Sequence, residues 1–225
     1  MKYFKFSLTI FIFWGIMIGN PARAQAKDDI ADLPVTFIPA KNQPGETMVL
    51  FLTGDGGLNT FSQKLVDQYA ATGIPVVALN SSKYFWKRRT PDQSAQDIST
   101  LLYKYTKDLK KKSILLCGYS FGADVLPFIY MRLPQDLKEK VSRIQLLSPS
   151  AYTDFEVHLS YLFVSKKFDI ASEVKKIAKP VLCYYGASES DKPLNGLAMK
   201  NFKLIILKGD HHYNNSFSEI VDTGL

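Results

Sequence analysis

The stretch Ile114-Leu115-Leu116-Cys117-Gly118-Tyr119-Ser120-Phe121-Gly122-Ala123 decides how this chain is expected to fold. A continuous apolar run leads into a glycine, and a serine and a second glycine follow at alternate positions. An unbroken apolar run is typical of a strand that is buried on both faces. The residues after Ser120 have the pattern of a helix. The stretch therefore predicts a strand, a sharp turn at Ser120 and a helix.

Ser120 lies at the centre of a Gly-x-Ser-x-Gly motif, which is weak alone but is specific between a strand and a helix. A serine on such a turn adopts strained backbone geometry, and Gly118 and Gly122 let the neighbouring backbone pack closely. The helix that begins at Phe121 directs its N-terminal amides and its dipole at the site, which favours negative charge. Ser120 is therefore the predicted nucleophile.

Outward from this motif, short apolar runs alternate with longer amphipathic stretches. Alternation of strands and helices predicts an α/β class with a mostly parallel sheet of about six to seven strands flanked by helices. Together with the turn at Ser120, this order indicates the α/β-hydrolase fold. Asp154–Ala178 is the least regular stretch and is a candidate cap over the site. The expected strands are Val35–Ile38 at an edge, Thr47–Thr53, Ile74–Leu79, Ser113–Cys117, Arg143–Ser148, Pro180–Tyr185 and Lys203–Lys208. The expected helices are Thr60–Ala71, Pro91–Lys111, Phe121–Arg132 and Phe217–Val221.

The first 24 residues are expected to be a secretory signal peptide. Lys2 and Lys5 precede the apolar run Phe6–Ile18, and Ala22-Arg23-Ala24 is a small-x-small cleavage site. The apolar run is shorter than the ~20 residues that span a bilayer, which disfavours an uncleaved anchor. Residues 25–225 would then form a single domain in the periplasm.

The charge of the chain excludes some partners. Three of its 28 Lys and Arg residues fall in the first 24 residues and none of its 21 Asp and Glu residues does, so the remainder carries +4. This mild excess is compatible with an anionic membrane surface or substrate, and also with ordinary solubility. No polybasic run or nucleic-acid motif is present, so nucleic acid is not an expected partner, and the chain is expected to be a monomer.

The two cysteines are expected to be free and buried. Cys117 and Cys183 lie in strands that the predicted topology separates by a third strand, which places their Cα atoms too far apart for a disulfide.

A serine nucleophile needs a base, and three histidines are present. His158 falls in the irregular stretch, whereas His211 and His212 directly follow the last predicted strand, where this fold supplies its base. The Gly209-Asp210-His211 spacing favours His211 as the base, with His212 as a packing group.

The acid that orients the base is expected in the loop after the strand Pro180–Tyr185. Glu189 lies three residues after Gly186, a common offset for this role, and Asp191 is the commoner residue type. Asp191 is slightly preferred as the acid, and Glu189 remains the alternative.

The oxyanion of an acyl-transfer reaction needs hydrogen-bond donors. Leu52-Thr53-Gly54-Asp55-Gly56-Gly57 occupies the position of the glycine-rich oxyanion loop of esterases. The backbone amides of Asp55 and Phe121 are the candidates. No nucleotide-binding glycine motif and no cluster of metal ligands is present, so neither a cofactor nor a metal is expected.

A distinctive aromatic and basic stretch follows the second long strand. Loops at the carboxyl ends of strands line the ligand crevice in open α/β sheets. Tyr84 and Trp86 are therefore candidates for a substrate-facing wall, and Arg88 and Arg89 for a phosphate-binding rim. An aromatic lid with a solvated basic edge is the alternative interpretation.

The motifs taken together resemble the bacterial VirJ/AcvB virulence-protein family. The likeness runs from about Val49 to the C-terminus and rests on Leu52–Gly57, Tyr84–Trp86 with Arg89–Pro91, Gly118–Phe128 and Gly209–His212.

The resemblance implies an exported α/β-hydrolase near the inner membrane, with Ser120 and His211 as catalytic residues. It also implies hydrolysis of aminoacylated phosphatidylglycerol, notably the lysyl form. The ammonium group of such a substrate needs an acidic or aromatic partner, and Asp55 and Tyr84 are the candidates. The alternatives are a generic carboxylesterase or thioesterase, and a non-catalytic periplasmic module that assists type IV secretion or envelope assembly.

Overall fold

The computed structural model describes residue 1 and residues 32–42, 45–157 and 167–225. Its strands are β1 (Val35–Ile38), β2 (Thr47–Leu52), β3 (Val76–Leu79), β4 (Ser113–Tyr119), β5 (Val141–Leu147), β6 (Tyr152–Thr153), β7 (Phe168–Asp169), β8 (Val181–Gly186) and β9 (Phe202–Leu207). Its helices are α2 (Thr60–Ala71), α3 (Ser81–Tyr84), α4 (Pro91–Asp108), α5 (Phe121–Arg132), α6 (Gln135–Lys140), α7 (Ile170–Val174), the 3-10 helix η2 (Tyr213–Asn215) and α8 (Phe217–Gly224).

The main sheet confirms the predicted fold class. Its seven strands lie in the order β1-β3-β2-β4-β5-β8-β9. Only β1 runs antiparallel to its neighbour, and the other pairs are parallel. Because the strands are parallel, the loops after β2, β3, β4, β5, β8 and β9 all emerge at one edge of the sheet. This edge collects every site residue that the sequence predicts.

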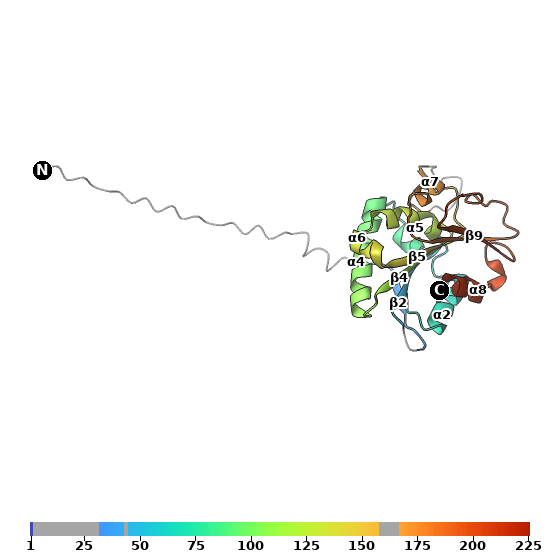
Figure 1. The fold of residues 1–225 in the computed structure, drawn as a ribbon, viewed down its shortest axis with the longest axis horizontal. Helices are drawn as coiled ribbons and strands as arrows, with labels where there is room; N and C mark the ends of the chain where they lie inside the picture. Colours follow the sequence, from blue (N-terminus) through green and yellow to red (C-terminus); the bar gives the residue numbers. More distant parts are fainter. Residues whose placement is uncertain (2–31, 43–44, 158–166) are drawn as a thin grey trace.

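Helices cover the sheet on both sides (Figure 1), which explains why the strands are apolar on both faces. On one side, Leu50 and Leu116 belong to a core formed with α4, α5 and α6. On the other side, Phe51 and Leu115 pack with residues of α2 and α8. Consecutive residues of one strand therefore point into different cores, as the period of two in a strand requires.

Both cysteines are free and buried, as predicted. Cys117 on β4 belongs to the core beneath α2 and α8, whereas Cys183 on β8 belongs to the core beneath α4 and α5. Strand β5 lies between them. The two thiols are therefore separated both by a strand and by the sheet itself.

The structure differs from the sequence prediction mainly at short elements. Helix α4 ends at Asp108 rather than Lys111, because the chain turns away with Lys110 in the left-handed region at φ 52°. The short helices α3, α6 and α7 and the β6–β7 ribbon were not predicted, because so few residues carry no readable periodicity. Strand β7 and helix α7 fall within the candidate cap Asp154–Ala178, and β6 directly precedes it.

Some predictions fall on parts of the chain that the structure does not describe. The expected signal peptide lies within residues 2–31, and His158 lies within residues 158–166. Within the described residues, no helix combines the length and the apolar character needed to cross a bilayer.

Candidate active site

Ser120 occupies the sharp turn between β4 and α5. Its backbone has φ 52° and ψ −121°, a conformation that is uncommon for a residue with a side chain. The Ser120 amide donates to the Leu147 carbonyl at 2.8 Å, and the Ser120 carbonyl accepts from the amides of Ala123 and Asp124 at 2.8 and 3.0 Å. These hydrogen bonds from β5 and α5 fix the strained residue between two rigid elements.

The two glycines of the motif are sterically required. A Cβ on Gly118 would lie 2.5 Å from the Gly122 carbonyl oxygen, and a Cβ on Gly122 would lie 2.2 Å from the Leu52 carbonyl oxygen. Real side chains do not tolerate such distances, so α5 packs this closely on β2 and β4 only with glycine at both positions. The turn at Ser120 therefore has the structure that the motif predicts.

His211 lies beside the serine turn. The Tyr119 hydroxyl donates to the His211 carbonyl at 3.3 Å, and the two rings lie 5.2 Å apart between centroids. In the described part of the chain, no hydrogen bond joins the Ser120 hydroxyl to His211. Such catalytic hydrogen bonds are often long in a structure without substrate and tighten when substrate binds. His212 instead makes an edge contact with Phe61 at 5.5 Å.

Of the two acidic candidates, the structure brings Glu189 to the histidine. The Nδ1 atom of His211 lies 3.0 Å from Oε2 of Glu189. Asp191, which the sequence slightly favours, forms no hydrogen bond with His211 in the described residues. The reason is the short turn after β8, in which the Glu189 amide donates to the Gly186 carbonyl at 3.1 Å and directs that side chain toward the base.

Further polar groups hold the carboxylate of Glu189. Its Oε1 atom accepts from the Ser148 hydroxyl at 2.7 Å and from the Gly186 amide. The Ser148 hydroxyl also forms a hydrogen bond with the Tyr213 hydroxyl. Burial raises the pKa of Glu189, but the hydrogen bonds from His211, Ser148 and Gly186 outweigh it and leave the pKa below its usual value. Glu189 is therefore ionised at neutral pH and oriented by groups on three segments.

The acid and base loops also pack directly against each other. A Cβ on Gly186 would lie 2.1 Å from the Asp210 carbonyl oxygen, so only glycine permits this approach. The amides of Ala187 and Ser188 donate to the carbonyls of Leu207 and Gly209 at 2.7 and 2.9 Å. The distance between Glu189 and His211 is thus set by backbone contacts.

The glycine-rich loop after β2 reaches the serine. A Cβ on Gly54 would lie 3.3 Å from the Cβ of Ser120. Asp55 follows Gly54, and Phe121 follows Ser120, so the two candidate oxyanion amides lie next in the chain to residues that are in contact. The role of these two amides as oxyanion donors stays a prediction.

The loop after β3 differs from its prediction at Tyr84 and Arg89. Tyr84 is 3% exposed, and its hydroxyl donates to Asp97 on α4. Burial and the contact with Asp97 raise the pKa of Tyr84, which keeps this hydroxyl protonated. The Arg89 guanidinium stacks 4.1 Å from the Tyr84 ring centroid and pairs with Asp97 at 3.1 Å. These two side chains are used for packing, so Tyr84 does not form a substrate-facing wall.

Trp86 and Arg88, in contrast, stay at the surface. Trp86 is 59% exposed. Arg88 pairs with Glu156 at 2.7 Å and lies 3.8 Å from Asp154. Their predicted contact with substrate stays a prediction.

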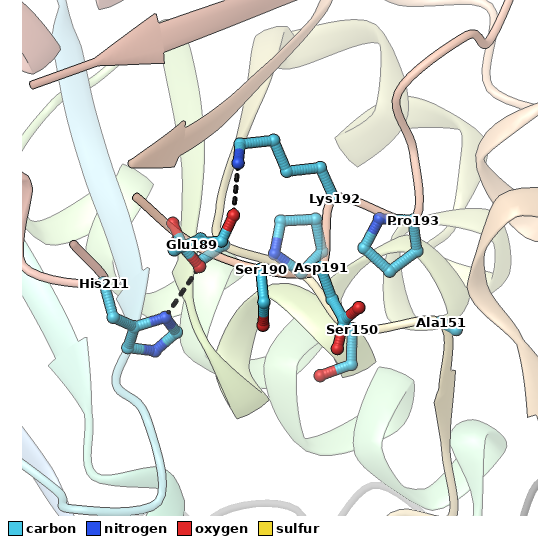
Figure 2. Close-up of a pocket in the computed structure, with 10 residues that line it drawn as sticks. Ser150, Ala151, Glu189, Ser190, Asp191, Lys192, Pro193 and His211 are labelled. Carbon is cyan, nitrogen blue, oxygen red and sulfur yellow. Dashed lines mark hydrogen bonds and ion pairs between the residues drawn. The ribbon is translucent and has the colours of Figure 1, made fainter. Parts of the chain in front are cut away.

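A cavity of about 560 Å³ opens beside His211 and Glu189. Figure 2 shows the residues around it, with Asp191 in the loop that follows Glu189 and Ser150 in the loop after β5. The Lys192 side chain extends toward the Glu189 backbone, and its ammonium donates to the carbonyls of Glu189 and Ala187. The lining residues are Ser148, Pro149, Ser150, Ala151, Glu189, Ser190, Asp191, Lys192, Pro193 and His211.

Asp124 is a buried carboxylate behind this cavity. It lies in the first turn of α5, is 6% exposed, and accepts from the Ser150 amide at 2.6 Å. Burial raises its pKa to about 7, against the lowering effect of Ser150 and the charge of His211. The raised pKa marks Asp124 as a candidate functional residue next to the site.

Sequence reasoning did not single out Ser148, Ser150, Tyr213 or Asp124. Ser148 directly follows β5, so its place at the carboxyl edge of the sheet was a usable signal. Asp124 lies one turn after the nucleophile, where a buried acid is unexpected. The role of Tyr213 depends on a contact across the fold and left no local signal. No group of side chains suited to a metal ion occurs in the described parts of the chain.

Comparison with solved structures identifies the fold. The esterase Est1E from Butyrivibrio proteoclasticus superposes with a TM-score of 0.61 at 15% identity, over 84% of this chain and 90% of that one. An α/β serine hydrolase homologue from Coxiella burnetii gives 0.61 at 15% identity, over 84% and 88%. An esterase from Pyrococcus furiosus gives 0.59 at 16% identity, over 88% and 92%. At such identities the likeness establishes the α/β-hydrolase fold.

No curated protein matches the chain by sequence. The profile of the family described as "Bacterial virulence protein (VirJ)" matches residues 46–225, which include the turn at Ser120, both acidic candidates and the histidine pair. Because the match spans most of the chain, this protein belongs to the bacterial VirJ virulence-protein family.

Proposed function

We propose that this protein is a serine hydrolase that cleaves carboxylic esters through a triad of Ser120, His211 and Glu189. The proposal rests on one observation above all, the 3.0 Å contact between Nδ1 of His211 and Oε2 of Glu189 beside the strained serine turn. A carboxylate on Nδ1 leaves Nε2 unprotonated and available as a base. The strained turn that carries Ser120 between β4 and α5 supports its role as the nucleophile.

In the proposed reaction, His211 Nε2 takes the proton of the Ser120 hydroxyl as Oγ attacks the ester carbonyl carbon. The resulting imidazolium is stabilised by the ionised Glu189. The oxyanion is held by the backbone amides of Asp55 and Phe121, and the N-terminal end of α5 adds its dipole.

Collapse of the tetrahedral intermediate breaks the ester C–O bond. His211 returns its proton to the leaving alcohol, and the acyl group remains on Ser120. Water then attacks this acyl-enzyme with His211 again as base, which releases the carboxylic acid and regenerates Ser120. No cofactor takes part in either half of the reaction.

The preferred substrate is the aminoacyl ester of phosphatidylglycerol, with the lysyl form first, as family membership suggests. The exposed Trp86 and the side chains of Lys87 and Arg88 beside it support peripheral contact with an anionic membrane. An N-terminal signal peptide would place the enzyme in the periplasm, where the lipid surface is accessible. Tyr84 is buried, so it is removed from the candidates for binding the substrate ammonium.

The direct test compares the protein from residue 25 onward with its Ser120→Ala variant on lysyl-phosphatidylglycerol and on a short p-nitrophenyl ester. The variant should lose at least ~10³-fold in kcat, because the nucleophile is absent. Equal turnover by both proteins would exclude Ser120 as the nucleophile.

The same experiment separates the alternatives. Turnover of the short ester alone would indicate a generic carboxylesterase or thioesterase. Absence of turnover on any ester, with an intact fold by circular dichroism, would favour a non-catalytic module in secretion or envelope assembly.

A further inference from the structure

The cavity beside His211 lies where part of a bound ester must extend. The ester carbonyl has to sit between Ser120 and His211, and His211 itself lines the cavity. The volume of about 560 Å³ exceeds the volume of any amino-acid side chain. Its walls come from the loop after β5 and the loop after β8, two segments that the Ser148–Glu189 hydrogen bond ties together.

The charges around the cavity are predominantly negative. Glu189 already interacts with His211, whereas Asp191 pairs with no Lys or Arg among the residues that the structure describes. Among the described residues that line the cavity, Lys192 is the single Lys or Arg, and its ammonium is held by backbone carbonyls of Ala187 and Glu189. Figure 2 shows its side chain running toward Glu189, away from the carboxylate of Asp191.

A second carboxylate lies behind the same wall. Asp124 is buried and accepts from the amide of Ser150, and Ser150 lines the cavity. A carboxylate taken out of water is costly unless a positive charge lies near it. A cation in the cavity would therefore interact favourably with Asp191, and with Asp124 in its ionised form.

We propose that this cavity is the subsite for the ammonium group of the substrate's acyl portion, and that Asp191 is the carboxylate that pairs with that ammonium. The proposal rests on the proposed esterase function for the orientation of the substrate. It makes Asp191 a specificity-determining residue and explains why two carboxylates occur so close together in the acid loop. Glu189 orients the histidine, and Asp191 binds the substrate ammonium.

The opposite orientation, with the lipid phosphate in the cavity, is disfavoured by charge. A phosphate there would face Asp191 and Glu189, and the ammonium of Lys192, the one Lys or Arg side chain among the described lining residues, is held by backbone carbonyls. Like charges at short range repel. The phosphate therefore lies outside the cavity, and the acyl group inside it.

The kinetic test uses two glycerol esters with the same six-carbon acyl chain, the L-lysyl ester, which carries two amino groups, and the hexanoyl ester, which carries none. In the wild type the ratio of kcat/KM for lysyl over hexanoyl should be high. Asp191→Asn should lower this ratio by ~10- to 100-fold, because a charge-assisted hydrogen bond is lost. Asp222→Asn, an exposed position on α8, removes the same charge outside the cavity and should leave the ratio unchanged.

A binding test is independent of turnover. L-lysinamide and uncharged hexanamide are titrated by NMR into the Ser120→Ala protein and into the Ser120→Ala, Asp191→Asn protein. Lysinamide should bind more tightly than hexanamide to the first, and the Asp191→Asn change should weaken its binding at least ~10-fold.

Two results would overturn the proposal: a lysyl-to-hexanoyl ratio that is unchanged in Asp191→Asn, whether or not both rates fall together, or lysinamide binding that does not depend on Asp191. Failure of the esterase function is distinguishable from these. In that case neither ester is hydrolysed, whereas lysinamide still binds in an Asp191-dependent way.

Discussion

Two regions at the same edge of the sheet use their side chains in opposite ways. The loops after β5, β8 and β9 hold polar groups in a hydrogen-bonded network around His211, whereas the loop after β3 buries Tyr84 under Arg89 and against Asp97. Both regions carry the aromatic and charged residues that suggest a binding site in the sequence. The difference is that backbone contacts fix the first region and side-chain packing fixes the second.

The comparison teaches which sequence signals are reliable in a chain of this kind. Ser120 lies on the turn that its motif predicts, and the short turn after Gly186 brings Glu189 to His211. Residues with long side chains, such as Arg89, can instead form ion pairs and stacking contacts with the nearest partner. Mutations in the first region should therefore affect catalysis, and mutations in the second should affect stability.

After Ser120→Ala, the largest effect is expected from Glu189→Gln. The amide keeps the shape of the side chain but cannot stabilise the imidazolium, so kcat on a neutral ester should fall by ~10³- to 10⁴-fold. Asp191→Asn should lower kcat on the same ester far less. Stopped-flow or steady-state assays of the two variants measure the difference, and similar small losses would mean that another residue orients His211.

Asp124→Asn tests the energetic cost of the buried carboxylate in the first region. The pKa of Asp124 is raised from 3.8 to about 7, chiefly by burial, with a further rise from Asp55 and opposition from Ser150 and His211. Between these pH values the folded state binds a proton that the unfolded state releases, so wild-type stability should fall as pH rises from 4 to 7.

The Asn variant lacks this titration and keeps an oxygen that can accept from the Ser150 amide. Its free energy of unfolding should match the wild type near pH 4 and exceed it at pH 8 by a few kcal/mol, on the order of the ~1.4 kcal/mol per pKa unit that linkage gives. Urea unfolding at the two pH values measures this. Parallel stabilities across the range would show that Asp124 does not titrate as described.

Much of the fold and part of the site follow from the sequence, because period and turn chemistry are local. The unbroken apolar runs give the parallel strands, and Gly118 and Gly122 give the serine turn. The choice between Glu189 and Asp191 does not follow, since it depends on a short turn after Gly186 and on a packing contact with Asp210. Tyr213 reaches Ser148 from a distant segment, and no local pattern reports such a contact.

Tyr84→Phe tests the second region. The change removes the hydrogen bond to Asp97 and leaves the buried ring and the stacked Arg89 in place. Stability should fall by about 1–2 kcal/mol, as for a lost hydrogen bond to a charged group. Ester hydrolysis should stay within about twofold. A thermal melt and a kcat/KM measurement give both values, and a large rise in KM with unchanged stability would return Tyr84 to the substrate site.

Trp86→Ala should have the smallest effect, and it concerns the part of the second region that stays at the surface. Trp86 is 59% exposed and follows the buried pair Tyr84 and Phe85. The two buried rings anchor the loop, and the Trp86 ring lies at the surface. An exposed tryptophan beside basic residues suits the interface of an anionic membrane. Its removal should weaken binding to phosphatidylglycerol vesicles by roughly fivefold, or ~1 kcal/mol, and leave hydrolysis of a soluble ester unchanged.

The matched control is Tyr103→Ala, because Tyr103 is an aromatic residue on α4 that is 42% exposed. If vesicle sedimentation shows the same loss of binding for both variants, exposed aromatic residues contribute to membrane binding in general, and Trp86 is not a specific membrane contact. A loss for Trp86→Ala alone would show that the loop after β3 faces the lipid. The two regions would then divide the substrate between them, with the loop after β3 at the membrane and the loops around His211 at the ester.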